Sequence, residues 1–253
     1  MLAVDIFERS GLAFLSRWGH VIVGVLWIGL LWYFNFVQTP SFAQMDGAAR
    51  NDAIDKLASR ALWWFRWAAA ATFGFGILLL LIQQYPDKHD NLKAQLFNTE
   101  YFKSAQGLSI LTGALLGVTM FLNVWLVIWP NQKKVIANAR NVAAGGQADP
   151  AAADAGRRSA LASRQNAIFS FPMLFFMVGT AHFFGSYDTG SDRGIYWAIT
   201  LVIWLVLELN CLGVIGGRTQ NITNWIYENH WRAIGVGVGL AAIWYVIWEL
   251  VFA

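Results

Sequence analysis

The sequence predicts an all-α integral membrane bundle of about six transmembrane helices, and three observations lead to this fold class. Hydrophobic residues make up 57% of the 253 residues and charged residues only 13%, which is far from the composition of a soluble domain. The chain contains 14 Trp, a residue type that is enriched at membrane–water interfaces. Several apolar runs are about as long as the roughly 20 residues that a helix needs to cross a bilayer.

We expect a single transmembrane domain over residues 1–253. Its spans are predicted, in order, at 18–37, 61–82, 107–129, 167–185, 195–216 and 233–252. Residues 1–16 before the first span are interpreted as an N-terminal interfacial segment. They begin MLAVDIFERS, where two acids precede the only arginine, so we do not expect a cleaved signal peptide. Residues 138–160 contain NVAAGGQADPAAADAG, an Ala- and Gly-rich stretch without aromatics that predicts a flexible cytoplasmic linker.

The distribution of Lys and Arg predicts the topology. Six spans put both termini on one side of the membrane, and twelve of the 18 Lys and Arg residues fall on the opposite side. Because cytoplasmic loops carry an excess of these residues, loops one, three and five are assigned to the cytoplasm. The expected localisation is a bacterial inner (cytoplasmic) membrane, crossed several times, with both termini in the periplasm.

Two histidines inside apolar runs form the main candidate site. His20 lies near the start of the first span and His182 near the end of the fourth, so the topology places both in the outer leaflet. Two neutral imidazoles at matched depth on different helices are an arrangement that holds a haem iron from both faces. We therefore predict that His20 and His182 are the axial metal ligands of one haem b. The alternative for each is an interfacial side chain that only bonds a backbone carbonyl.

The residues near the two histidines suit a flat macrocycle. Small residues beside each histidine would leave room for a porphyrin edge, and an arginine at the water boundary would pair with a haem propionate. The alternative for the small residues is ordinary helix packing. The expected cofactor-binding residues beside the histidines are Arg17, Gly24, Trp27 and Gly179, with Phe175 and Phe183 as further walls.

The other polar residues within or near the spans have simpler interpretations. His89 lies in a polar loop and His230 at the cytoplasmic mouth of the sixth span, so neither is expected to share the haem. Glu208, well inside the fifth span, is interpreted as protonated, hydrogen-bonded to another helix, or a possible proton site. Asn35 and Asn123 are interpreted as interhelical hydrogen-bonding groups.

Short motifs exclude several kinds of site. The one cysteine, Cys211, rules out disulfides, cysteine-based zinc sites and a CxxCH haem attachment within this chain. The sequence contains no Gly-rich phosphate loop, HExxH or GxSxG motif, and GVGVG at 235–239 is interpreted as a helix-packing surface.

Three stretches resemble the urate oxidase N-terminal membrane domain family. They are RWGHVIVGVLWIGLLWYFNFVQTP at 17–40, IWPNQKK at 128–134 and SRQNAIFSFPMLFFMVGTAHF at 163–183. The resemblance implies a haem-b membrane protein with His20 and His182 at matching histidine positions, and electron transfer associated with urate oxidation in a respiratory chain. Some members carry a fused C-terminal cytochrome c. Here the sequence reaches Ala253 directly after the sixth span, so we expect a separate cytochrome c or respiratory membrane complex as the partner.

Three hypotheses for function follow, each from a different class. The first is a haem b electron-transfer protein that passes electrons towards a periplasmic cytochrome c, either from urate or within a respiratory complex. Such a protein could be a component of an oxidoreductase. The second is a non-catalytic accessory subunit of a larger membrane complex. The third, a solute transporter using Glu208 as its proton site, is the least favoured because no repeat between the halves is evident.

Overall fold

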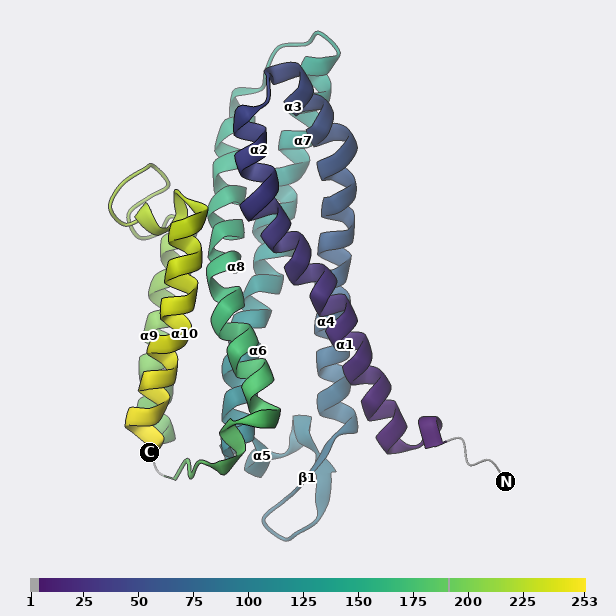
Figure 1. Ribbon diagram of the computed structural model, residues 1–253, viewed down its shortest axis with the longest axis vertical. Helices are drawn as coiled ribbons and strands as arrows, with labels where there is room; N and C mark the ends of the chain where they lie inside the picture. The colour runs from purple at the N-terminus through teal and green to yellow at the C-terminus, as the bar shows by residue number, and fades with distance from the viewer. Residues whose placement is uncertain (1–4, 191) are drawn as a thin grey trace.

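Long helices that run the length of the molecule make up the computed structural model, which describes residues 5–190 and 192–253 (Figure 1). Three of them are rods in which two α-helices are joined without a gap through a π-helical turn, and the fourth is a single α-helix. The rods are α1 (Arg9–Trp32), η2 (Tyr33–Gln38) and α2 (Thr39–Gln44); α3 (Gly47–Ala53), η3 (Ile54–Ala58) and α4 (Ser59–Ile82); and α6 (Ala105–Leu122), η5 (Asn123–Ile128) and α7 (Trp129–Ala143). The fourth helix is α8 (Pro150–His182).

Two shorter helices, α9 (Arg193–Cys211) and α10 (His230–Phe252), complete the bundle beside α8 (Figure 1). The short turn η1 (Asp5–Phe7) precedes α1. Short elements connect the helices: β1 (Gln84–Pro86), β2 (Leu92–Ala94), η4 (Gln95–Phe97), α5 (Thr99–Lys103), η6 (Phe184–Ser186) and η7 (Trp225–Tyr227). The two strands pair antiparallel, with Tyr85 opposite Lys93.

The predicted fold class is confirmed. Within residues 5–190 and 192–253, five helical stretches are long and apolar enough to cross a membrane: Arg9–Gln44, Gly47–Ile82, Ala105–Ala143, Arg193–Cys211 and His230–Phe252. α1 begins and α10 ends at the same end of the bundle (Figure 1), as an even number of passes requires. The predicted placement of both termini on one side therefore agrees with the fold.

The fourth predicted span, 167–185, does not meet the same standard. It falls in α8, which ends at His182 and is not among the five apolar stretches. The reason is a buried polar run in α8 that includes Arg164, Gln165 and Asn166. α8 lies inside the bundle against α6, α7 and α10, so these groups meet protein partners and not lipid.

In the described part of the expected interfacial segment at 1–16, a single turn, η1 (Asp5–Phe7), is separate from the first long helix. Residues 1–4 lie outside the described residues, and α1 runs from Arg9 through the first predicted span without a break. Ser16 is buried there and donates its hydroxyl to the carbonyl of Leu12, one turn earlier. The first helix is therefore longer at its N-terminal end than the hydropathy pattern indicates.

The expected linker at 138–160 is mostly helical. α7 continues to Ala143 and α8 begins at Pro150, which leaves only a short turn between them. Asn141 Nδ2 donates to the carbonyl of Gln147 (2.6 Å), and the Asp149 N–H donates to Asn138 Oδ1 (2.7 Å). Alanine is the strongest helix former, so the Ala-rich composition that predicted a linker favours helix once α7 and α8 pack.

Asp149 caps the first turn of α8, and its removal gives a first prediction. Its carboxylate accepts a hydrogen bond from the Ala151 N–H (2.9 Å), and Pro150 occupies the first helical position. We expect Asp149→Ala to destabilise this turn by about 1 kcal/mol, seen as faster amide hydrogen exchange at 151–153. Asp149→Asn keeps a capping oxygen and should exchange like the wild type; equal exchange in all three proteins would contradict the cap.

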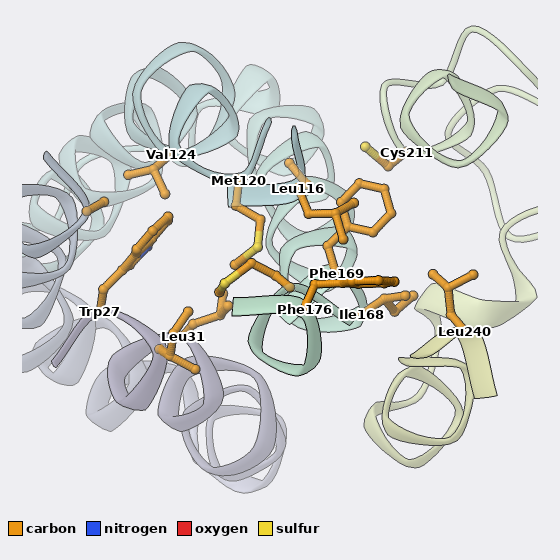
Figure 2. Packing of buried hydrophobic residues seen from close by; sticks show 14 of the residues in the cluster. Trp27, Leu31, Leu116, Met120, Val124, Ile168, Phe169, Phe176, Cys211 and Leu240 are labelled. Carbon is orange, nitrogen blue, oxygen red and sulfur yellow. The ribbon is translucent and has the colours of Figure 1, made fainter. Parts of the chain in front are cut away.

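The core lies between the helix pairs. Figure 2 shows Trp27 and Leu31 of α1 directed towards Met120 of α6 and Val124 of η5, with Phe169 and Phe176 of α8 beside them. On the other face of α8, Ile168 faces Leu240 of α10 (Figure 2). α8 is thus the element against which both halves of the bundle pack.

α9 and α10 are much shorter than the other helices. At 1.5 Å per residue, the 19 residues of α9 span about 28 Å and the 33 residues of α8 about 50 Å. The turn joining α9 to η7 and α10 lies well short of the tips of α3, α7 and α8 (Figure 1). Since a bilayer core is about 30 Å thick, the α2–α3 and α7–α8 hairpins extend beyond it at the end opposite the two chain termini.

Candidate functional site

His20 lies where α1 packs on α4, and a backbone hydrogen bond orients its ring. Nδ1 lies 2.9 Å from the carbonyl oxygen of Thr72. A carbonyl oxygen can only accept, so Nδ1 carries the proton, and in the neutral ring Nε2 keeps its lone pair. Gly76 gives the ring space, since a Cβ there would lie 3.3 Å from His20 Cε1. This bond to a backbone carbonyl is what the interpretation of His20 as an interfacial side chain predicts. The same kind of bond also fixes the tautomer of histidines that ligate a metal.

His182 is the last residue of α8 and is exposed. At 100° per residue it lies roughly 120° around the helix from Ser170, which meets α1 through Trp32 Nε1 (2.9 Å). It shares a face instead with Phe175, whose ring contacts Tyr245 of α10. Among the described residues no hydrogen bond or ring contact links the two histidines. The structure therefore places both towards the same end of the bundle but on surfaces that face different helices.

The glycines beside the histidines are used for packing. A Cβ at Gly179 would lie 2.5 Å from Phe184 Cε2, so the buried Phe184 ring already fills the space expected for a porphyrin edge. Gly24 lies against α4, with Thr72 Cγ2 as the nearest atom to its Cβ position at 3.8 Å. The packing interpretation therefore explains both glycines.

Four other expected contacts of the haem lie in different surroundings. Trp27 is 3% exposed and its indole N–H has no hydrogen-bond partner, so this buried donor is free for a polar group. Arg17 is exposed, as a residue at the water boundary should be. The ring of Phe183 packs on Tyr245 of α10, as does that of Phe175, so both rings lie on the α10 side of α8.

His89 and His230 lie away from His20, as expected. His89 is in the exposed turn between β1 and β2, where its backbone N–H donates to Asp87 Oδ1 (2.8 Å). The Lys93 ammonium, 2.8 Å away, and this N–H hold the pKa of Asp87 well below its ordinary range. His230 begins α10 at the far end of the bundle and packs beside Trp231.

Four consecutive residues of α8 form a second, buried polar site that spans the bundle. Ser163 accepts from Asn35 Nδ2 of η2 (2.9 Å), and Arg164 Nη1 donates to the Asn35 carbonyl (3.3 Å). Gln165 accepts from the Tyr227 hydroxyl of η7 (2.7 Å). The fourth residue, Asn166, donates to the carbonyl of Met120 in α6 (2.9 Å). This polar quartet, residues 163–166, ties three separate parts of the chain to α8.

Glu208 of α9 joins the polar quartet through Asn123. Asn123 Nδ2 donates to Asn166 Oδ1 (3.0 Å) and lies 3.3 Å from Glu208 Oε2. The Cys211 thiol, one turn along α9, is also within hydrogen-bonding reach of the carboxyl group. The bond to Asn166 confirms the expected interhelical hydrogen bond of Asn123. Glu208 is only 9% exposed, so its expected interior position is also confirmed.

Sequence reasoning identified Asn35, Asn123 and Glu208 singly but missed the polar quartet that connects them. A signal was present, because SRQN places four polar residues at the start of an apolar run. Asn35 and Asn123 both lie in π-helical turns, which occur often at functional sites.

Comparison with known proteins bears on both candidate sites. Residues 90–210 match the urate oxidase N-terminal family. The resemblance predicted from the sequence is confirmed over that segment. The urate oxidase N-terminal match includes the polar quartet, Asn123, Glu208 and His182, and it does not extend to His20. No curated protein and no solved structure matches this chain.

Proposed function

We propose that this chain is a membrane haem b protein that transfers single electrons, with His20 as an axial ligand of the iron. The observation that carries the proposal is the Nδ1–H···O bond from His20 to Thr72, because it orients the ring and leaves Nε2 as the donor. The unpartnered indole N–H of Trp27, two turns further along the same face of α1, is a second group suited to a polar ligand. When bound, haem b would supply a one-electron iron couple.

The predicted pairing of His20 with His182 remains part of the proposal. The exposed position of His182 leaves its ring accessible, but its orientation towards α10 means that one haem would reach both residues only if the end of α8 turned.

The proposed direction of transfer is towards a periplasmic cytochrome c or a respiratory complex, with urate as one candidate reductant. The match to the urate oxidase N-terminal family supports this chemistry. The charge distribution supports the direction, since Lys133, Lys134, Arg140 and Arg157 all lie in the helices that extend beyond the bilayer at the far end. The exposed Arg17, on the His20 side, is the group proposed to meet a haem propionate.

A visible spectrum tests the proposed cofactor and gives the second prediction. The reduced-minus-oxidised spectrum of the purified chain should show a haem b α-band. His182→Ala should lose the low-spin band if both histidines hold one iron, whereas His89→Ala and His230→Ala are matched controls that should keep it. A His182→Ala protein with the wild-type band would remove His182 from the ligand set, and a wild-type chain without haem would favour the accessory-subunit hypothesis.

A further inference from the structure

Glu208 is a buried carboxyl group without a cationic partner. It lies nine-tenths buried within α9, and none of the ion pairs among the described residues includes it. A lone carboxylate in a low-dielectric interior is costly, so such a group either binds a proton or holds a cation.

The hydrogen bonds around Glu208 favour a proton over a metal ion. The Met120 carbonyl can only accept, so Asn166 must direct its NH₂ towards it and its oxygen towards Asn123. Asn123 must then present its own NH₂ both to Asn166 and to Glu208. Glu208 is therefore faced by an N–H donor, whereas Na⁺ or Ca²⁺ requires several oxygen ligands.

A cavity lies at the Lys- and Arg-rich end of the bundle, one turn of α9 from Glu208. It has a volume of about 210 Å³, enough for several water molecules, and its lining includes Leu126, Asn131, Cys211 and Arg218. Cys211 lines the cavity and lies one turn after Glu208 on α9, so the Cys211 side chain lies between Glu208 and the cavity.

The charged and titratable groups near Glu208 come from several elements. Arg158 of α8 and Arg218 of the loop after α9 line the cavity, and both pair with Asp154 (2.8 and 3.4 Å). Tyr227 of η7 donates its hydroxyl to Gln165 Oε1, and burial raises its pKa, so it stays neutral. Among the described residues that line the cavity, Cys211 is therefore the titratable group outside these ion pairs, and it lies one turn of α9 from Glu208.

We propose that Glu208 is a proton-binding site that exchanges with water at the Lys- and Arg-rich end of the bundle through the cavity beside Cys211. In this step the Cys211 thiol gives its proton to a Glu208 carboxylate oxygen while its sulfur takes one proton from a hydronium ion in the cavity, which yields a neutral carboxyl group, a restored thiol and a water molecule. The Asn123 N–H stabilises the ionised form by its hydrogen bond and so keeps the proton removable. The inference rests on the bundle and not on the haem, so failure of either proposal leaves the other standing.

Infrared difference spectroscopy in lipid nanodiscs tests the site. The pH-difference spectrum of the wild type should contain the C=O band of one buried carboxyl group. The isosteric Glu208→Gln variant should lose that band, whereas Glu249→Gln, a matched control at the other end of the bundle, should keep it. Asn123→Leu removes the donor and should move the midpoint of the band to higher pH, by about one unit or more.

The same measurement tests whether the proton enters through the cavity and whether Glu208 binds a proton or a metal ion. Leu126 lines the cavity and is 69% exposed, so Leu126→Trp should fold and should slow hydrogen–deuterium exchange of the carboxyl band severalfold. Unchanged exchange in that variant would overturn the route through the cavity. No difference between wild type and Glu208→Gln at any pH, or a band that responds to Na⁺ at fixed pH, would overturn the proton site.

Discussion

His20→Ala should purify as a folded membrane protein that has lost its haem. The His20 ring is the predicted ligand whose orientation the structure fixes, through Nδ1 and the carbonyl of Thr72. Removal of a ligating imidazole should lower haem occupancy by on the order of tenfold or more, since even the loss of an outer-shell partner costs about that much affinity. The haem-to-protein ratio of the purified variant, with its reduced-minus-oxidised spectrum, measures the effect. Wild-type haem content in His20→Ala would refute the ligand assignment.

Alanine substitutions at two glycines of α4 test how contact with the His20 ring affects the haem. A Cβ at Gly76 would press on His20 Cε1 at 3.3 Å, whereas a Cβ at Gly74 meets nothing within 4 Å. Gly76→Ala should therefore retain haem but shift the position or potential of its band, because the ring must move relative to Thr72. Gly74→Ala is the matched control and should be spectroscopically silent. A shift of equal size in both variants would show that helix propensity, and not contact with His20, is responsible.

Gly237→Ala should be the most destabilising small substitution in α10. A Cβ at Gly237 would lie 2.5 Å from Phe171 Cδ2 and 3.0 Å from the carbonyl oxygen of Ile168. Neither neighbour can move easily, because Phe171 is stacked on Trp32 at 5.4 Å and the carbonyl belongs to the backbone of α8. Pro172 cannot donate the helical hydrogen bond, and α10 approaches α8 at the same turn. We expect a loss of about 1–3 kcal/mol in the free energy of unfolding.

The control for this prediction lies in the same GVGVG stretch. A Cβ at Gly235 or Gly239 meets no atom within 4 Å, so Gly→Ala there should be neutral or stabilising by up to about 1 kcal/mol through helix propensity. Thermal unfolding of the three variants in one detergent compares them directly. Opposite signs for Gly237→Ala and its two neighbours would support close α8–α10 packing, and equal signs would contradict it.

Hydropathy predicted most of the fold because lipid-facing segments are apolar along their whole length. It located the C-terminal half of α8 at 167–185 but missed the half before it, where Arg164, Gln165 and Asn166 are satisfied by neighbouring helices and lower the hydropathy of a helix that runs the length of the bundle. It also failed at 138–160, because composition alone cannot show that Asn138 and Asn141 close a turn between two helices.

The candidate sites were predictable residue by residue, but their connections were not. His20 and Glu208 stood out because ionisable groups are rare within apolar runs. Which helix meets the His182 face of α8 depends on the packing of α10, and the bond from Asn123 to Asn166 depends on the register of α6 against α8. Neither relationship is local in sequence, so a single chain without its fold does not specify them.

The helical hairpin formed by α7 and α8 has a practical consequence for imaging this small protein. It continues about 20 Å past the 30 Å bilayer core, whereas α9 and α10 do not, so the molecule has an asymmetric projection that a detergent micelle or nanodisc does not conceal. The short turn at 144–149 joins two helix ends, which makes it a natural place to splice in a rigid helical fusion partner. Such a fusion would provide a fixed marker for particle alignment in electron cryo-microscopy and would reveal any haem as density directly.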